Sequence, residues 1–229
     1  MKRIERFCDV MIKAIIFDLD GVIVESEKAH IEAEQQAFLE HGVQISAEEL
    51  HKYTGTTAKM MFTELIKKHK LNTTFEEIFS QKEEILFKLL EQEAEPTRGV
   101  IELLEKLKKR NVKLAIGSSS NKKLIEYVLR KLSITHLFDC VVSAENIVHS
   151  KPNPEIFLKA AAELGVSPVE CAVIEDAKLG VEAAKRAGIK CVGYRNPNSG
   201  QQDLSKADMI IDDFTKVDVD KLLSQIDAR

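Results

Sequence analysis

Near its N-terminus the sequence reads Ala14-Ile15-Ile16-Phe17-Asp18-Leu19-Asp20-Gly21-Val22. The first half of this stretch is apolar and rich in β-branched residues, which is typical of a buried strand that runs into a turn. Asp18 and Asp20 stand at the end of the strand, where an extended chain turns both side chains the same way. Adjacent carboxylates repel unless a cation or a proton lies between them. Because ligands bind at the carboxyl ends of strands in open α/β sheets, the pair indicates either a binding site or a plain acidic turn.

The string from Phe17 to Val22 resembles the first signature of the haloacid dehalogenase superfamily. More narrowly, it is similar to the signature of the small-molecule phosphatases and β-phosphoglucomutases of that superfamily. The resemblance implies that Asp18 is a nucleophile that becomes an aspartyl-phosphate. It implies that Asp20 protonates the leaving group and later activates water, for which we expect its pKa to be raised in a closed, dry site. It also implies a Mg²⁺ cofactor between the aspartates and the phosphate.

Two further polar segments follow predicted strands. Residues 117–120 read Gly-Ser-Ser-Ser and precede a helix, which indicates an anion site or an ordinary helix cap. Lys151 lies in a loop that is pinned by Pro152 and Pro154, whereas most loop lysines are simply exposed. The resemblance implies that Ser118 holds phosphoryl oxygens and that Lys151 neutralises charge beside the nucleophile. It further implies a cis bond before Pro152.

Glu175 and Asp176 follow a fourth apolar run. With Asp18 they form an oxygen-rich set suited to Mg²⁺, although an acidic helix start would also explain them. The resemblance implies the metal ligands Asp18, Asp20, Glu175 and Asp176. The expected phosphate- and substrate-binding residues are Leu19, Ser119 and Asn121 in the core and His30, Gly55, Lys59 and Lys82 in the cap. For the cap residues an ordinary surface role stays open.

Strand-like and helical segments alternate from residue 98 onward, whereas residues 29–95 show only helical periodicity. Capping boxes are expected at Ser46–Glu49 and Thr74–Glu77. This pattern predicts an α/β protein with a three-layer α/β/α, Rossmann-like parallel sheet and an inserted, all-helical cap. The predicted domains are a catalytic core over residues 11–24 and 98–229, a cap over residues 25–97, and an N-terminal extension over residues 1–10.

The composition narrows the possible partners. The chain has 229 residues, with 44% hydrophobic residues, 31% charged residues and a net charge of −4, an ordinary balance for a soluble protein. Its basic residues form no cluster of the kind that binds nucleic acid, and no apolar run is long enough to span a membrane. The four cysteines lack Cys-x-x-Cys spacing, which favours a reducing cytosol. We expect a small phosphorylated metabolite as partner and a monomer or weak dimer.

These observations together predict a Mg²⁺-dependent phosphatase of a small phosphorylated metabolite, a sugar or polyol phosphate. A β-phosphoglucomutase is the first alternative. In the mutases that the chain resembles, an Arg that grips the remote phosphate follows a cap glycine, whereas Ala58 occupies that position here. Lys59 is adjacent, but neighbouring helical residues point about 100° apart. A receiver-like signalling module and a scaffold without activity are more distant alternatives, disfavoured by Asp20, by the helical insertion and by the intact motifs.

Overall fold

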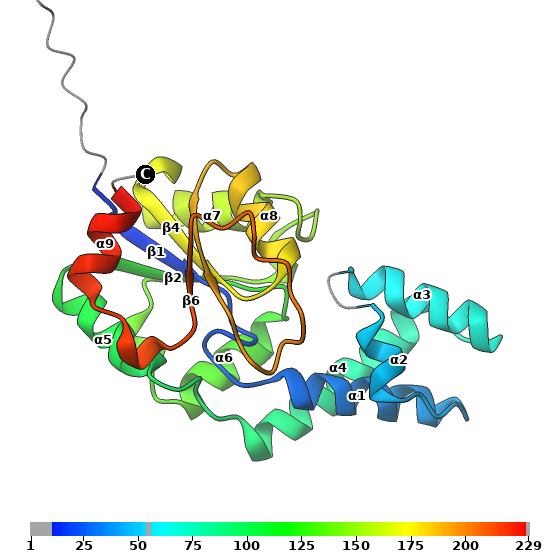
Figure 1. Ribbon diagram of the computed structural model, residues 1–229. Coiled ribbons are helices and arrows are strands. Elements are labelled where there is room, and N and C mark those ends of the chain that lie inside the picture. The colour runs from blue at the N-terminus through cyan, green and yellow to red at the C-terminus, as the bar shows by residue number, and fades with distance from the viewer. Residues whose placement is uncertain (1–10, 54–55, 228–229) are drawn as a thin grey trace, which may run out of the picture.

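The computed structural model describes residues 11–53 and 56–227, so the predicted extension over residues 1–10 lies outside it. Its strands are β1 Ala14–Phe17, β2 Lys113–Gly117, β3 Cys140–Val142, β4 Cys171–Glu175, β5 Lys190–Tyr194 and β6 Met209–Ile211. In the described residues they form a six-stranded parallel sheet with the order β3-β2-β1-β4-β5-β6 (Figure 1). β1 therefore lies inside the sheet, between β2 and β4.

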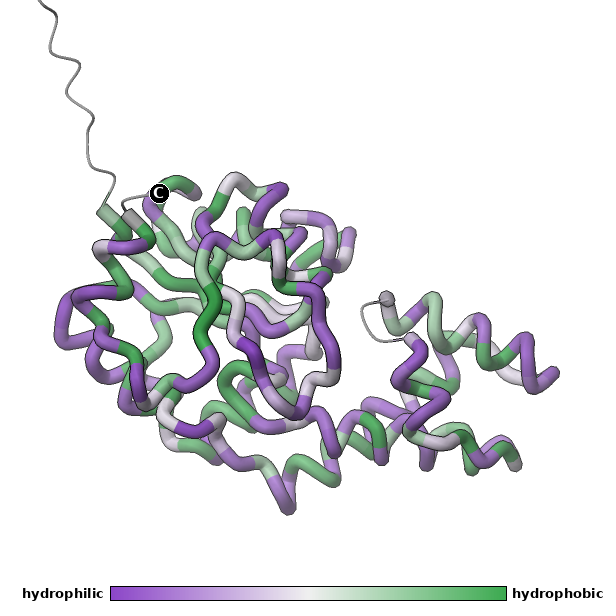
Figure 2. The backbone as a smooth tube through the Cα atoms, in the orientation of Figure 1, coloured by the Kyte–Doolittle hydropathy of each residue, from purple (hydrophilic) through white to green (hydrophobic). Residues whose placement is uncertain are grey.

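Helices cover both faces of the sheet. They are α5 Val100–Lys109, α6 Lys122–Lys131, α7 Glu155–Leu164, α8 Lys178–Arg186 and α9 Val219–Asp227, with short 3-10 turns at Thr135–Leu137, Ala144–Asn146, Pro168–Glu170 and Phe214–Lys216. Ile15 and Phe17 of β1 pack in a cluster with α5, α6 and α9, whereas Ala14 and Ile16 pack with α7 and α8. Successive strand residues point to opposite faces, which explains the continuous apolar run of β1. Figure 2 shows the hydrophobic colouring of these central strands. The predicted three-layer α/β/α class is confirmed.

A second group of helices follows β1 and has its own core. These helices are α1 Glu27–Glu40, α2 Ala47–His51, α3 Ala58–His69 and α4 Phe75–Glu93. They extend to one side of the sheet in Figure 1. Their buried cluster is Ala37, Phe38, Ile45, Leu50, Met61, Phe62, Leu65 and Ile78. The rings of Phe38 and Phe62 stack with centroids 5.4 Å apart. This group is the all-helical insertion that the sequence predicts.

The two predicted capping boxes differ in the structure. Thr74 and Glu77 form the complete box, because each side chain bonds the backbone N–H of the other. At the start of α2, the Ser46 hydroxyl accepts a hydrogen bond from the Glu49 N–H, but the return bond is missing. The Glu49 carboxylate instead accepts a hydrogen bond of 2.5 Å from Lys68 Nζ on α3. The prediction of a complete box at Ser46 is therefore wrong, because an ion pair between helices competes for the carboxylate.

The chain passes into and out of the helical group at adjacent points. Val24 and Pro96 form an antiparallel bridge. The Glu25 N–H donates to the Glu95 carbonyl at 3.0 Å, and the Thr97 N–H donates to the Ile23 carbonyl at 3.0 Å. We call residues 23–25 and 95–97 the neck. Both connections to the helical group therefore run side by side beside the end of β1.

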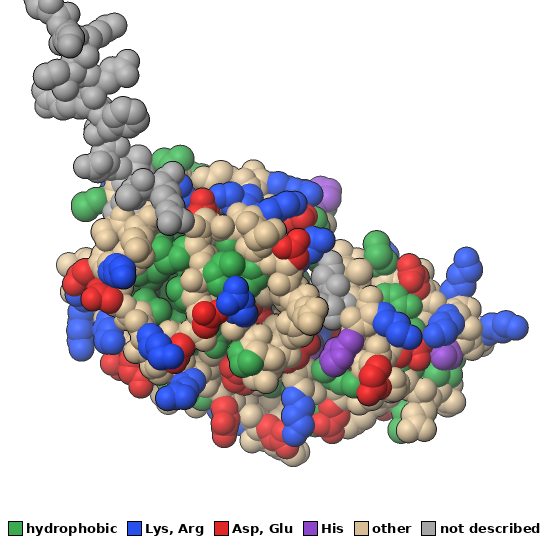
Figure 3. All heavy atoms as spheres, viewed as in Figure 1, with side chains coloured by type: hydrophobic (Ala, Val, Ile, Leu, Met, Phe, Trp, Pro, Cys, Tyr) green, Lys and Arg blue, Asp and Glu red, His purple; other side chains and the backbone are tan. Residues whose placement is uncertain are grey.

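Charged side chains of both signs are interspersed over the face of the molecule shown in Figure 3. A hollow with green, hydrophobic atoms is visible over β6 and α9 on the same face. Among the described residues, no helix combines the length and the apolar character that a membrane crossing requires.

Candidate active site

Three of the predicted site residues meet at the carboxyl ends of neighbouring strands. Asp18 directly follows β1, Glu175 is the last residue of β4, and Lys151 lies in the loop between β3 and α7. The Lys151 Nζ lies 2.5 Å from Asp18 Oδ1 and 2.8 Å from Glu175 Oε1. All three side chains are buried. Because β1 and β4 pair in parallel, their ends place two carboxylates around one ammonium.

The charges of this trio perturb one another. Burial raises the pKa of Asp18 to about 7; Lys151 opposes this rise, while the charges of Glu175 and Asp20 add to it. Burial alone would lower the pKa of Lys151, but the carboxylates of Asp18 and Glu175 outweigh it and raise this pKa above its ordinary value. Lys151 therefore stays charged near neutral pH. The peptide bond between Lys151 and Pro152 is cis, as the resemblance implies.

Asp176 adds a third buried carboxylate beside the trio. The Ser199 hydroxyl donates a hydrogen bond to its Oδ2 atom. Burial raises the pKa of Asp176 well above its ordinary value, and the neighbouring charges of Glu175 and Asp18 raise it further. The site thus holds more negative charge than Lys151 alone can balance.

Two glycines make room for these carboxylates. Gly21 has a φ of +75°, and a Cβ at this position would lie 2.1 Å from Asp176 Oδ2. A Cβ on Gly180, in the first turn of α8, would lie 1.6 Å from Glu175 Oε1. Because such approaches are impossible for real atoms, any larger residue would displace the carboxylates. The two glycines are therefore part of the site as spacers.

The donor set suits a divalent cation. Asp18, Glu175 and Asp176 offer carboxylate oxygens, the ligands that Mg²⁺ prefers. Burial is the main cause of the raised pKa values of Asp18 and Asp176, and neighbouring carboxylates, whose repulsion a cation would relieve, add to it. As the side chains stand, no three His, Cys, Asp or Glu residues in the described part of the chain converge as a ligand set. Lys151 bridges two of the carboxylates, and Ser199 holds the third. The residues fit Mg²⁺ chemically, and binding requires their side chains to turn.

Asp20 faces a different environment from Asp18. Its Oδ2 accepts a hydrogen bond of 2.7 Å from Ser120, and its Oδ1 accepts one of 2.7 Å from Ser26 and lies 3.2 Å from His30 Nε2. Burial would raise the pKa of Asp20, but the hydrogen bond and charge of His30 and the two serine hydroxyls outweigh it. The pKa therefore lies well below its ordinary value. The expectation of a raised pKa is wrong for this conformation, because three donors stabilise the carboxylate.

A chain of contacts continues from His30 into the helical group. The Lys82 Nζ lies 3.0 Å from His30 Nδ1 and donates to Glu83 Oε1 at 3.0 Å. The Asn121 amide in turn donates to Glu83 Oε2 at 3.0 Å. Lys82 is only 3% exposed. The predicted residues His30, Lys82 and Asn121 are thus brought into one network, which orients Asp20 from the side of the cap.

The remaining predicted site residues differ in their burial and in their distance from the site. The hydroxyl of Ser118 is buried and accepts a hydrogen bond of 3.0 Å from the Ser120 N–H. The side chain of Leu19 is buried in the core, and Ser119 is exposed. The Lys59 side chain is 72% exposed and lies 3.9 Å from Glu76, so the structure does not bring it to the site. Gly55 lies outside the described residues.

Sequence reasoning missed four residues of this environment: Ser26, Glu83, Ser120 and Ser199. For Ser120 a signal existed, because it belongs to the serine run that also contains Ser118. Ser26 occupies the N-cap position of α1 but makes no capping bond with its side chain. Nothing in the sequence distinguishes Ser199 or Glu83 from other polar loop and helix residues.

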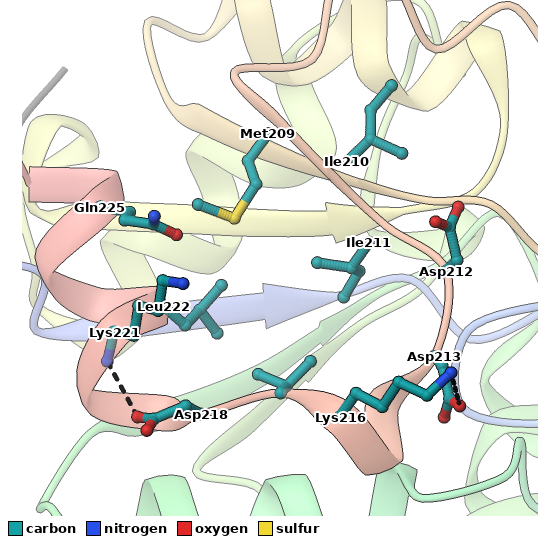
Figure 4. Close-up of a pocket in the computed structure, with 11 residues that line it drawn as sticks. Met209, Ile210, Ile211, Asp212, Asp213, Lys216, Asp218, Lys221, Leu222 and Gln225 are labelled. Carbon is teal, nitrogen blue, oxygen red and sulfur yellow. Dashed lines mark hydrogen bonds and ion pairs between the residues drawn. The ribbon is translucent and has the colours of Figure 1, made fainter.

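A separate hollow of about 360 Å³ lies between β6 and α9 (Figure 4). Met209, Ile211 and Leu222 form its apolar part, and Asp213 is paired with Lys216 at its rim. In the sheet β6 is separated from β1 by β4 and β5. This hollow is therefore not part of the candidate active site.

Known proteins resemble this chain along most of its length. The family model described as haloacid dehalogenase-like hydrolase matches residues 15–194. The validoxylamine A 7'-phosphate phosphatase of Streptomyces hygroscopicus subsp. limoneus is 32% identical, over 90% of this chain and 96% of that protein. The fructose-1-phosphate phosphatase YqaB of Escherichia coli (strain K12) is 30% identical, over 79% of this chain and 95% of that protein. The crystal structure of a β-phosphoglucomutase from Clostridium difficile has a TM-score of 0.81 at 27% identity, over 95% of this chain and 98% of that one.

These similarities confirm the predicted superfamily and the predicted class of enzyme, a phosphoric monoester hydrolase. The matched region begins within β1 and ends with β5, so it includes the strand ends that carry Asp18, Ser118 and Glu175. By its sequence and its fold, the chain belongs to the haloacid dehalogenase-like hydrolases.

Proposed function

We propose that this chain is a Mg²⁺-dependent phosphatase that hydrolyses a small phosphorylated sugar or polyol through an aspartyl-phosphate on Asp18. The observation that carries the proposal is the buried Lys151 ammonium, 2.5 Å from the Asp18 carboxylate at the ends of the central strands. A carboxylate nucleophile needs such a charge nearby, because it must approach an anionic phosphate. The relatives named as phosphatases of fructose 1-phosphate and validoxylamine A 7'-phosphate support this class of substrate.

In the proposed reaction, an oxygen of Asp18 attacks phosphorus and the bond from phosphorus to the leaving-group oxygen breaks. Lys151 and the Ser118 hydroxyl hold the phosphoryl oxygens. Asp20 gives its proton to the departing alkoxide, and then takes a proton from the water that hydrolyses the aspartyl-phosphate. Mg²⁺, when bound by Asp18, Glu175 and Asp176, supplies charge that stabilises the phosphoryl oxygens. The low pKa of Asp20 keeps it ionised in this conformation, so its role as the acid of the first step requires this pKa to rise when substrate is bound.

Residues 25–97 are proposed to act as a cap over a core of residues 11–24 and 98–227. Two residues that bind Asp20, Ser26 and His30, belong to the cap segment, whereas Ser120 belongs to the core. Asp20 is therefore held from both sides only when the cap lies against the core. In that position the cap also excludes water from the site. The free cysteines Cys140, Cys171 and Cys191 support a cytosolic location, where thiols stay reduced.

A β-phosphoglucomutase is the alternative, and the fold similarity to the C. difficile enzyme supports it. A mutase must grip a second phosphate, and an Arg is suited to this because it forms two parallel hydrogen bonds. Ala58 lines the cavity beside the cap helices, whereas Lys59 pairs with Glu76 at the surface. The geometry therefore favours the phosphatase.

The test supplies β-glucose 1-phosphate, a trace of glucose 1,6-bisphosphate and Mg²⁺, and follows glucose 6-phosphate and free phosphate together. A phosphatase releases free phosphate as the main product, with little glucose 6-phosphate. If glucose 6-phosphate forms much faster than free phosphate, the chain is a mutase. A parallel reaction with p-nitrophenyl phosphate controls for active enzyme.

The charge of the site predicts a requirement for Mg²⁺. Excess chelator should abolish turnover, and Asp176→Asn should raise the Mg²⁺ concentration needed for half-activity by at least about 10-fold. Mg²⁺ at about 100 times the wild-type Kd should also raise the Tm of the wild type by on the order of 5 °C, and that of Asp176→Asn by about half as much or less. Asp212→Asn, an exposed aspartate paired with Arg195, is the matched control. Full turnover in chelator contradicts the prediction.

A further inference from the structure

Two adjoining cavities, of about 1060 and 220 Å³, lie between the cap helices and the core. Glu27, Ile31 and His51 of the cap line both of them. On the core side, Asn198 lines the larger cavity and Gln202 lines the smaller one. The two cavities share these three residues, and we call them together the cleft, with α1 and α2 on one side and the loop after β5 on the other.

Both walls of the cleft are attached to the candidate active site. Glu27 directly follows Ser26, whose hydroxyl donates to Asp20 at 2.7 Å. On the other wall, the Gln202 amide donates to the Ser199 carbonyl at 3.2 Å, and the Ser199 hydroxyl donates to Asp176. Asp18 itself lines neither cavity, but both walls reach the site through these contacts, so the leaving group of a phosphate at Asp18 would extend toward the cleft.

The cleft wall on α1 carries unpaired negative charge. Glu27, Ile31 and Glu34 lie at spacings of four and three residues, which places them on one face of the helix, and all three line the smaller cavity. We call them the α1 stripe. The side chains of Glu27 and Glu34 make no hydrogen bond or ion pair with another residue of the described chain. Burial raises the pKa of both carboxyls, and the charges of His30 and Lys82 offset only part of this rise.

Cations are scarce in the rest of the cleft. Among the described residues that line the smaller cavity there is no Lys or Arg. The larger cavity adds the carboxylates Glu25, Glu32, Glu93 and Glu95 and the single cation Lys28. The ammonium of Lys82 lines neither cavity, and it contacts His30 and Glu83. The cleft would repel a second phosphate and attract a positive charge.

We propose, on the basis of the phosphatase function above, that the leaving group carries a protonated amino group. The substrate class is then the phosphate monoester of an amino sugar or aminopolyol. Its hydroxyls suit the polar lining from Thr56, Thr57 and Gln202, and its ammonium lies against Glu27 and Glu34. A hydrogen bond between an ammonium and a carboxylate is stronger than one between neutral groups, particularly where water is partly excluded.

The experiment compares kcat/KM for three esters in Mg²⁺: glucosamine 6-phosphate, glucose 6-phosphate and glucose 1,6-bisphosphate. The first two esters differ at one carbon, where glucosamine 6-phosphate carries an ammonium group and glucose 6-phosphate carries a hydroxyl group. We expect the amino ester to exceed glucose 6-phosphate by about 10-fold, and the bisphosphate to be the poorest substrate. The preference should shrink at high salt, because the cleft is partly open to solvent.

Variants locate the source of the preference. Glu27→Gln and Glu34→Gln should raise KM for glucosamine 6-phosphate and reduce the preference toward unity. Glu64→Gln, an exposed cap residue outside the cleft lining, should keep it. Circular dichroism and thermal unfolding of each variant check that its fold is intact. Equal kcat/KM for the three esters, or a preference that both glutamate variants retain, overturns the amino-group proposal alone. Failure of the wild type on p-nitrophenyl phosphate overturns the phosphatase function itself.

Discussion

Asp18→Asn is expected to reduce phosphatase turnover by at least about 10⁴-fold, because it removes the proposed nucleophile and an amide cannot replace a carboxylate. The substitution changes almost no volume. Lys151 keeps its 2.8 Å contact with Glu175 in the variant, so its ammonium is not left without a partner. The loss is measured as steady-state release of p-nitrophenol from p-nitrophenyl phosphate at saturating Mg²⁺.

The covalent intermediate provides the decisive readout. Wild-type protein mixed with substrate and quenched in acid should carry one phosphoryl group on the peptide that contains Asp18, detected by mass spectrometry, and Asp18→Asn should carry none. Circular dichroism and thermal unfolding check that the variant is folded, and Asp212→Asn is the matched control at an exposed aspartate. A phosphorylated peptide that lacks residue 18 would show that another residue is the nucleophile.

Asp20→Asn is expected to have an effect that depends on the leaving group. For an alkyl ester such as glycerol phosphate, the phosphorylation step should slow by about 10²–10⁴-fold, since the alkoxide then leaves without a proton. For p-nitrophenyl phosphate the same step should slow by less than about 10-fold, because p-nitrophenolate is stable without protonation. The isosteric amide can still interact with Ser26, Ser120 and His30, so the loop is expected to stay in place.

Single-turnover kinetics separate the two steps. Phosphorylation is followed by release of the alcohol, and hydrolysis of the aspartyl-phosphate is followed by release of phosphate. Hydrolysis should be slow in Asp20→Asn for every ester, because the base that activates water is missing. Equal slowing of phosphorylation for good and poor leaving groups would show that Asp20 does not act as the acid. Asp18→Asn serves as the reference for complete loss.

The sequence was sufficient to predict the sheet and the meeting of Asp18, Lys151 and Glu175. The reason is physical: parallel strands end at the same edge of a sheet, so residues placed just after buried apolar runs are brought together there. Ala14 and Ile16 face one side of the sheet, and Ile15 and Phe17 face the other. Because helices cover both faces, all four residues are apolar, so the sequence alone does not show which residues share a face.

Interactions between separate elements could not be predicted in this way. The low pKa of Asp20 depends on Ser26 and His30, which the cap brings to it, and on Ser120 from the next strand end. Glu49 failed to complete its capping box because Lys68, on another helix, competes for its carboxylate. In each case a local pattern was overridden by a partner distant in the chain, whose position only the folded structure supplies.

The neck has a consequence for how this enzyme could change over evolutionary time. Because Val24 and Pro96 lie against each other, the insertion is joined to the core at two adjacent points of the chain, the arrangement in which inserted segments are best tolerated. Replacement or redesign of residues between these ends leaves the strand order of the sheet untouched. Glu27 and Glu34 lie within that insertion, whereas Asp18, Lys151 and Glu175 lie outside it. Selection can therefore change the proposed substrate contacts of the insertion while the core strands stay the same, provided that Ser26 and His30, which hold Asp20, are kept.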